Sequence, residues 1–146
     1  MKVRPSAVIV HDQKVLTMRY QYQGTEVLAL PGGNPDPGEN LPEALARELQ
    51  EELGIAVQIG PMMLCGEVIW TEVNRHTLHT VFAIKELVGE PELNPDQTTA
   101  LSLEWIPIQE LTQHLLYPNF GALLQKCLQE GQLLGYVGPA LQPYLP

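Results

Sequence analysis

Short apolar runs separated by turn-forming residues dominate the first thirty positions of the chain. Residues 3–10 and 14–20 are rich in β-branched and apolar side chains, and the turn-prone His11-Asp12-Gln13 lies between them. A third run, residues 26–30, ends at Pro31-Gly32-Gly33. This pattern predicts three strands, and the N-terminal run is interpreted as a strand and not as a secretory signal.

The next apolar pattern has the period of a helix. Leucines repeat every four residues from Leu45 to Leu53, which places an apolar stripe on one helical face. Asn40 and Glu43 have the spacing of a capping box, and Gly54 provides a C-terminal stop. We therefore expect a helix that begins sharply after the breaker-rich loop at residues 34–38 and ends near Leu53.

Long β-prone stretches follow this helix. Residues 57–71 and 76–87 predict long strands, and a polar loop at residues 89–99 precedes a strand at residues 102–106. Strands on both sides of a central helix are typical of a mixed sheet sandwiched by helices. We expect a single α/β domain over residues 1–146.

The last third of the chain predicts two helices and an apolar tail. A short helix is expected at residues 109–115, and Asn119 is expected to cap a last helix ending near Glu130. Residues 131–146 are apolar and broken by Gly and Pro. This tail is expected either to cover the domain or to form a homodimer contact.

Composition narrows the class of partner. The 146 residues hold 8 Lys and Arg against 17 Asp and Glu, a formal net charge of −9. This balance argues against a nucleic-acid or anionic-membrane surface, but not against a phosphate ligand, because bound divalent cations invert the local field. No apolar run approaches the ~20 residues of a membrane span. Cys65 and Cys127 have no pairing or metal spacing and are interpreted as core residues, so a reduced cytoplasmic location is expected.

Three acidic residues gather on one face of the expected helix. At about 100° per residue, Glu48, Glu51 and Glu52 project within one sector, where their charges repel each other. A cation between them would make the cluster favourable, and oxygen ligands without His or Cys suit Mg²⁺ or Mn²⁺ better than zinc. For these three residues alone, a solvated acidic face is the alternative interpretation.

The acids belong to a longer pattern that runs through residues 33–55. Chance occurrence of this whole spacing is on the order of 10⁻⁷ at average residue frequencies. The spacing resembles the signature of the MutT-like Nudix hydrolase family without a departure. The pattern consists of Gly33, Glu39, Arg47-Glu48-Leu49, Glu51-Glu52 and Gly54-Ile55.

The resemblance implies an α/β/α sandwich with a central mixed β-sheet. It also implies hydrolysis of the pyrophosphate bond of a nucleoside triphosphate or nucleoside diphosphate derivative, with Mg²⁺ or Mn²⁺ as cofactor. Carried over by position, the metal ligands are Glu48, Glu51 and Glu52, with the Gly32 carbonyl as a further candidate. Arg47 would orient the glutamates through salt bridges, with Glu39 as a partner. Turn geometry is implied for Gly33, Gly38 and Gly54.

The implied mechanism is attack of a metal-activated water on phosphorus, with a carboxylate accepting its proton. Glu52 or Glu48 is our hypothesis for this base, because its location varies across the family. Glu104 or Asp96 could supply an extra ligand or the base, and a surface acid beside a core Trp105 is the ordinary alternative for Glu104.

Residues outside the signature give weaker indications of a substrate pocket. His76 and His79 are three apart, so on a strand they face opposite sides, which argues against a joint metal site. Both are expected at the surface or a pocket rim, and a place in the lining of a substrate pocket is the alternative for either. Tyr20, Tyr22, Trp70 and Phe82 are candidates for stacking on a base, with core packing as the alternative. Arg4, Arg19 and Arg75 are candidates for a phosphate contact, with ordinary solvation as the alternative.

Two functions remain open from the sequence. The first is the pyrophosphohydrolase, acting on a small-molecule nucleotide. The second is a non-catalytic module that senses a nucleotide such as ADP-ribose on the same fold. The intact glutamate set favours the enzyme, and the start close to the first strand favours a compact nucleotide or general pyrophosphate hydrolase.

Overall fold

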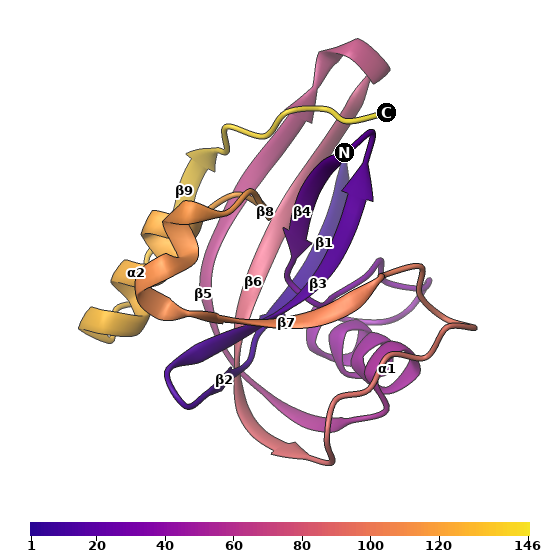
Figure 1. The fold of residues 1–146 in the computed structure, drawn as a ribbon, viewed down its shortest axis with the longest axis vertical. Helices are drawn as coiled ribbons and strands as arrows, with labels where there is room; N and C mark the ends of the chain where they lie inside the picture. The colour runs from indigo at the N-terminus through magenta and orange to yellow at the C-terminus, as the bar shows by residue number, and fades with distance from the viewer.

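The computed structural model describes residues 1–146, and their strands form two mixed sheets (Figure 1). The first sheet comprises β1 (Lys2–Val8), β5 (Ala56–Trp70), β6 (Arg75–Val88) and β9 (Gly135–Pro139). The second comprises β2 (Val10–His11), β3 (Lys14–Tyr22), β4 (Thr25–Ala29), β7 (Ser102–Pro107) and β8 (Leu116–Tyr117). In the first sheet β1 is parallel to β6, β6 is antiparallel to β5, and β9 is parallel to β5. In the second, β3 is antiparallel to β2, β4 and β7, while β4 is parallel to β8.

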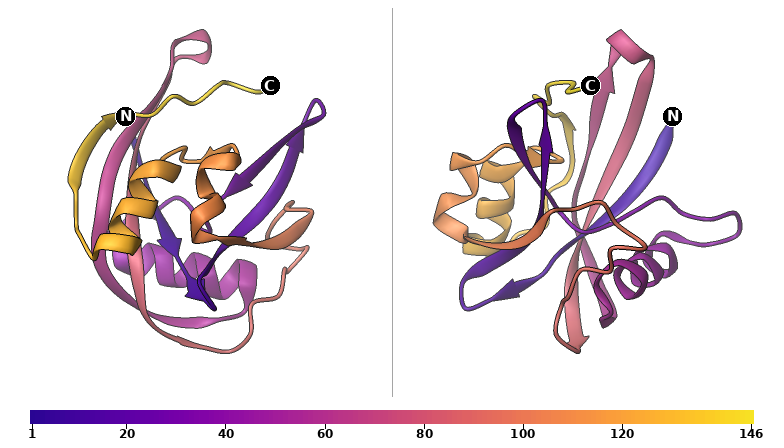
Figure 2. Two further views of the ribbon diagram at one scale, coloured as in Figure 1. Left: turned by 60° about the vertical axis from the view of Figure 1, so that its left-hand side comes forward. Right: turned by 45° about the vertical axis from the view of Figure 1, so that its right-hand side comes forward.

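Two α-helices cover opposite sides of the strands (Figure 2). The helix α1 (Leu41–Leu53) packs on β1 and β5, and α2 (Gly121–Glu130) packs on a 3₁₀ helix, η2 (Ile108–Gln113). A further 3₁₀ helix, η1 (Thr71–Val73), joins β5 to β6. The α/β class and the sandwich layering are therefore confirmed, with the strands divided between two sheets.

The expected helix after the breaker-rich loop is present with the expected caps. The Asn40 side chain accepts a hydrogen bond from the Glu43 N–H at 2.9 Å, and Glu43 accepts one from the Asn40 N–H at 3.1 Å. Gly54 ends the helix in the left-handed region, with φ of 67°. The leucines from Leu45 to Leu53 that repeat every four residues are fully buried. This apolar stripe fixes which face of α1 is left for the acidic side chains.

The short helix expected at residues 109–115 is present as the 3₁₀ helix η2. Two other local expectations are wrong. The run at residues 3–10 is two strands, because β1 ends at Val8 and β2 starts at Val10. Phe120, not Asn119, occupies the N-cap of α2. The Asn119 side chain instead accepts from the Leu116 N–H at 3.2 Å and donates to the Leu141 carbonyl at 3.0 Å.

The apolar tail folds back on its own domain. β9 adds to the edge of β5, and Leu134, Val137 and Ala140 pack against the core that lies under α2. Beyond β9 the chain passes the end of β5, where the Gln142 carbonyl accepts a hydrogen bond from the Trp70 indole N–H at 3.0 Å. The chain contains no helix of the length and apolar character needed to cross a membrane.

Candidate active site

Arg47 on α1 hydrogen-bonds to three carboxylates of the signature segment, and its Nε lies 3.4 Å from a fourth, that of Asp36. Its Nε and Nη2 donate to the two carboxylate oxygens of Glu39 at 2.7 and 2.9 Å, a two-point contact that fixes the guanidinium plane. Its Nη1 donates to Glu48 at 3.2 Å and to Glu51 at 3.1 Å. Hydrogen bonding to Arg47 lowers the pKa of Glu39, and the same contact raises the pKa of Arg47. The helix face therefore carries an ordered charge network.

The loop before α1 is folded onto this network. The Asn34 carbonyl accepts from Arg47 Nη2 at 3.1 Å, and the Asp36 N–H donates to Glu39 at 2.7 Å. Gly33 permits the close approach, since a Cβ there would lie 2.2 Å from Glu48 Cδ.

Gly38 and Gly54 have left-handed backbones, unlike Gly33, and Gly32 is closely packed. Gly38 and Gly54 have φ of 88° and 67°, so both positions require the freedom of glycine. At Gly32 a Cβ would lie 2.3 Å from the Pro5 carbonyl oxygen. The backbone of β1 and the loop are thus held together.

Glu52 stands apart from its neighbours because Arg47 does not reach it. Burial, and then the charge of Glu48, raises the pKa of Glu52 to about 7, and no hydrogen bond opposes this shift. Burial also raises the pKa of Glu48, although Arg47 opposes the shift there. Glu52 is consequently the carboxylate of this face that is free to exchange protons near neutral pH.

The three glutamates do not converge into a closed metal cage. No three His, Cys, Asp or Glu side chains lie close enough to enclose an ion, and Arg47 links Glu48 to Glu51. The donor chemistry nevertheless fits Mg²⁺ or Mn²⁺, because these ions bind carboxylate oxygens and retain several waters. Burial and neighbouring carboxylates raise the pKa values of Glu48 and Glu52, and a bound cation would offset both effects.

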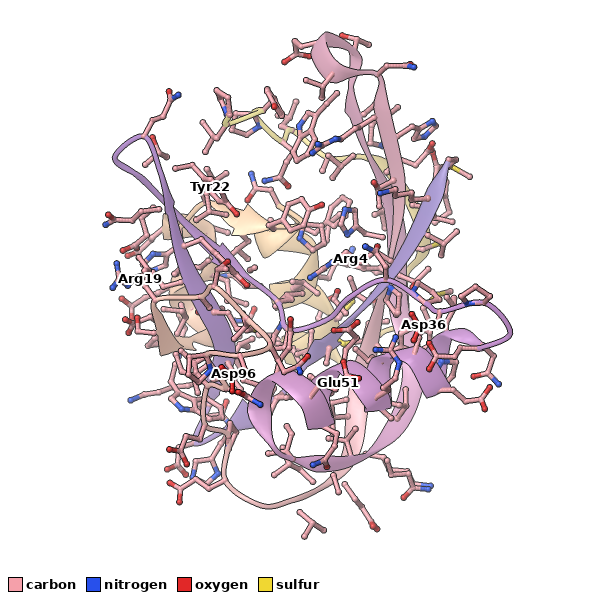
Figure 3. The ribbon with its side chains drawn as sticks, turned by 90° about the vertical axis from the view of Figure 1, so that its right-hand side faces the viewer. Arg4, Arg19, Tyr22, Asp36, Glu51 and Asp96 are labelled. Carbon is pink, nitrogen blue, oxygen red and sulfur yellow. The ribbon has the colours of Figure 1, made fainter.

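Arg4 of β1 supplies positive charge beside these carboxylates. Its Nη1 is buried and has no hydrogen-bond partner, and its guanidinium carbon lies 5.3 Å from the centroid of the Tyr117 ring. Its charge opposes the rise in the pKa of Glu52. Figure 3 shows Arg4 between Tyr22 of β3 and Asp36 of the loop, beside α1.

A cavity of about 460 Å³ opens between the two sheets next to Arg4. Of the four aromatic candidates, Tyr20, Tyr22 and Trp70 line it, whereas Phe82 packs in the core on the α1 side. Sequence reasoning missed Tyr117 and the tail, because only the fold brings them to the cavity. The lining residues are Arg4, Tyr20, Tyr22, Val27, Ala29, Trp70, Arg75, Tyr117, Gln142, Pro143, Tyr144, Leu145 and Pro146.

The arginine candidates fall into two groups. Arg4 and Arg75 line the cavity, while Arg19 is engaged by neighbours in the second sheet. Arg19 Nε donates to Ser102 Oγ at 2.9 Å and lies 3.7 Å from a carboxylate oxygen of Glu104. Glu104 thus has a partner other than the signature residues.

Asp96 lies on a loop that is tied to the end of α1. The Asn94 N–H donates to the Glu52 carbonyl at 2.9 Å, and the Glu92 N–H donates to the Leu53 carbonyl at 3.1 Å. Figure 3 shows Asp96 beside α1. Of the two outlying acids, Asp96 is the one on a loop that is anchored to the acidic helix, through Glu92 and Asn94.

The two histidines occupy different environments. His76 is partly exposed and pairs with Glu67. His79 is fully buried, so its expected place at the surface or a rim is wrong. It faces the Tyr117 ring edge-on at 4.8 Å, both its nitrogens lack partners, and burial lowers its pKa to about 3. The alternation of β6 turns this side chain into the space between the sheets.

Comparisons with known proteins place this geometry in a family. A model of the NUDIX domain matches residues 1–127. A MutT NUDIX hydrolase from Burkholderia pseudomallei is 30% identical, with a TM-score of 0.70, covering 85% of this chain and 96% of its own. The mutator MutT protein of Bacillus halodurans is 20% identical, with a TM-score of 0.75 and coverage of 100% and 94%. An ADP-ribose pyrophosphatase from Streptococcus suis is 19% identical, with a TM-score of 0.61 and coverage of 94% and 97%. The last two similarities concern the fold.

Proposed function

Because the chain belongs to the Nudix hydrolase family, we propose that it is a Mg²⁺- or Mn²⁺-dependent enzyme that cleaves the pyrophosphate bond of a nucleoside triphosphate or a nucleoside diphosphate derivative. One observation carries the proposal. The complete signature is folded so that Arg47 donates hydrogen bonds to Glu39, Glu48 and Glu51. Glu52 has no such bond and lies near Arg4, which lines the cavity. Cys65 and Cys127 are both free, which supports a cytoplasmic location.

Glu48, Glu51 and Glu52 would hold the divalent cation, with the Gly32 carbonyl as a further donor. When bound, such a cation neutralises phosphate oxygens and lowers the pKa of a coordinated water. Arg47 keeps the glutamates in place, because its two-point contact with Glu39 ties α1 to the preceding loop. The protein thereby holds the acidic face in one arrangement before substrate arrives.

Glu52 is our choice for the general base over Glu48. It has no hydrogen-bond or ion-pair partner, whereas Glu48 accepts from Arg47. A carboxylate with no competing donor keeps an oxygen available for the proton of the attacking water. Arg4 lines the cavity and its Nη1 has no hydrogen-bond partner, so it would bind phosphate oxygens of the substrate.

The test is phosphate release from a nucleotide panel in about 5 mM Mg²⁺ or Mn²⁺, with inorganic pyrophosphatase in one arm and alkaline phosphatase in the other. The panel contains nucleoside triphosphates, ADP-ribose, NADH, dinucleoside polyphosphates and sugar nucleotides. We expect metal-dependent turnover that falls by about 10³-fold or more in Glu52→Gln and is unchanged in Glu130→Gln, an exposed acid on α2. Binding without turnover across the panel would instead support the sensing module.

A further inference from the structure

A segment that follows the family-matched part of the chain forms one wall of the cavity between the two sheets. The family model matches residues 1–127, yet residues 142–146 line the cavity beside Arg4. We propose that this segment, positioned by Gln142 and presenting Tyr144, is a specificity-determining wall that binds the heteroaromatic base of a nucleotide. This inference rests on the proposed function, since it assigns the part of the same substrate that lies away from the scissile bond.

Gln142 fixes the segment in place with three hydrogen bonds. Its backbone carbonyl accepts from the Trp70 indole N–H at 3.0 Å. Its side-chain oxygen accepts from the Asn119 N–H at 2.7 Å, and its side-chain nitrogen donates to the Leu116 carbonyl at 2.9 Å. One glutamine therefore satisfies two backbone groups around β8 and orients an indole. The segment is positioned by specific polar contacts, as a recognition wall must be.

Aromatic rings from three distant parts of the chain meet at this wall. Tyr144 lies edge-on to Trp70, with ring centroids 5.4 Å apart, and Trp70 stacks on Tyr117 at 6.0 Å. Tyr20 and Tyr22 of β3 also line the cavity and stack on each other at 6.2 Å. Flat rings on separate elements of one cavity suit a flat heteroaromatic ligand, because every base has a face on which such rings stack.

The charge of the cavity points to a base that carries phosphate. Arg4 and Arg75 line it and no acidic residue does, although the chain has 17 Asp and Glu against 8 Lys and Arg. Its volume of about 460 Å³ lies within the range of small-molecule sites, roughly 300–1,000 Å³. A nucleotide satisfies both features, with the ring against the aromatic wall and the phosphate toward Arg4 and the acidic face of α1.

The position of Trp70 allows binding to be measured without hydrolysis. The chain has two tryptophans, so Trp105→Phe leaves Trp70 as the only one. In this background, with EDTA present, nucleoside monophosphates are titrated while the Trp70 emission is recorded. We expect saturable quenching, with the Kd raised about tenfold or more by Tyr144→Ala and largely restored by Tyr144→Phe. Leu141→Ala is the control, because Leu141 is 90% exposed and does not line the cavity.

The same variants are then assayed on the best nucleotide substrate in Mg²⁺. We expect Gln142→Ala and Tyr144→Ala to raise KM and reduce the preference among bases, while kcat stays within about twofold. A Kd, KM and base preference unchanged in Tyr144→Ala would overturn the inference, as would turnover of nucleotides by a protein that binds no nucleoside monophosphate. Saturable binding that depends on Tyr144, without turnover of any substrate, would uphold this inference while refuting the proposed hydrolase.

Discussion

Replacing Glu52 with glutamine should remove activity and at the same time stabilise the metal-free fold at alkaline pH. The reason is the environment of the carboxylate, where burial and the charge of Glu48 raise its pKa from 4.5 to about 7. The folded protein therefore holds the Glu52 proton more tightly than the unfolded chain does. Ionisation of Glu52 costs the folded state nothing below pH 4.5, an increasing amount between about pH 4.5 and 7, and a constant amount above.

The size of this cost follows from the difference in pKa. A rise of about 2.5 corresponds to about 3.4 kcal/mol at 1.36 kcal/mol per pH unit, which is the upper bound. Solvent screening at a partly exposed carboxylate reduces it to about 2 kcal/mol. Glutamine is similar in size and carries no charge, so Glu52→Gln should recover about 2 kcal/mol at pH 8 and less than about 1 kcal/mol at pH 5.

Urea unfolding in EDTA, at about pH 5 and pH 8, measures this difference directly. For a chain of 146 residues, about 2 kcal/mol is a shift in Tm of roughly 4–8 °C. The exposed Glu130→Gln variant is the matched control and should show no pH-dependent gain. A Glu52→Gln variant that is no more stable than the parent at pH 8 would refute the reasoning, because it would show that the site does not resist ionisation.

Three further perturbations follow from the same geometry. Arg47→Lys keeps a charge but loses the two-point contact with Glu39, so we expect kcat to fall by about 10²-fold or more in a Mg²⁺ assay, with folding retained by circular dichroism. Gly33→Ala would place a Cβ 2.2 Å from Glu48 Cδ, so we expect it to weaken Mg²⁺ binding, measured by calorimetry, and an unaltered affinity would contradict the close packing. Arg4→Gln removes the free guanidinium from the cleft and should raise KM by about tenfold or more, while Arg4→Lys should recover part of the loss.

The parts of the fold that could be predicted from sequence are those fixed by neighbours along the chain. The capping box of Asn40 and Glu43 and the leucine stripe of α1 depend on contacts three or four residues apart. The signature pattern placed Arg47 among the acids for the same reason, since Glu48 and Glu51 lie one and four positions from it. Contacts between residues one to four positions apart depend on the sequence spacing and not on how the sheets are arranged.

The parts that could not be predicted depend on contacts between distant segments. Asn119 is a residue type that often caps helices, but its side chain accepts from Leu116 and donates to Leu141, which lies 22 residues further along the chain, beyond β9. His79 is buried because β6 lies between β1 and β5 and faces Tyr117 of the other sheet. Neither Leu141 nor Tyr117 is close in sequence to the residue it contacts, so a local pattern assigned both side chains incorrectly.

The residues proposed for the chemistry are close in sequence, whereas those proposed for substrate recognition come from distant segments. The charged groups that we propose to act at the scissile bond come mainly from one helix and the loop before it, where a local signature specifies them. The cavity beside them is assembled from β1, β3, β4, β5, β6, β8 and the C-terminal segment, which approach one another only through sheet pairing. Replacing a lining residue such as Tyr144 leaves the Arg47 network untouched, because the two share no hydrogen bond or ion pair. Substrate preference can therefore change in this architecture while the hydrolytic machinery stays intact, and this separation explains why the signature identifies the reaction but leaves the base unspecified.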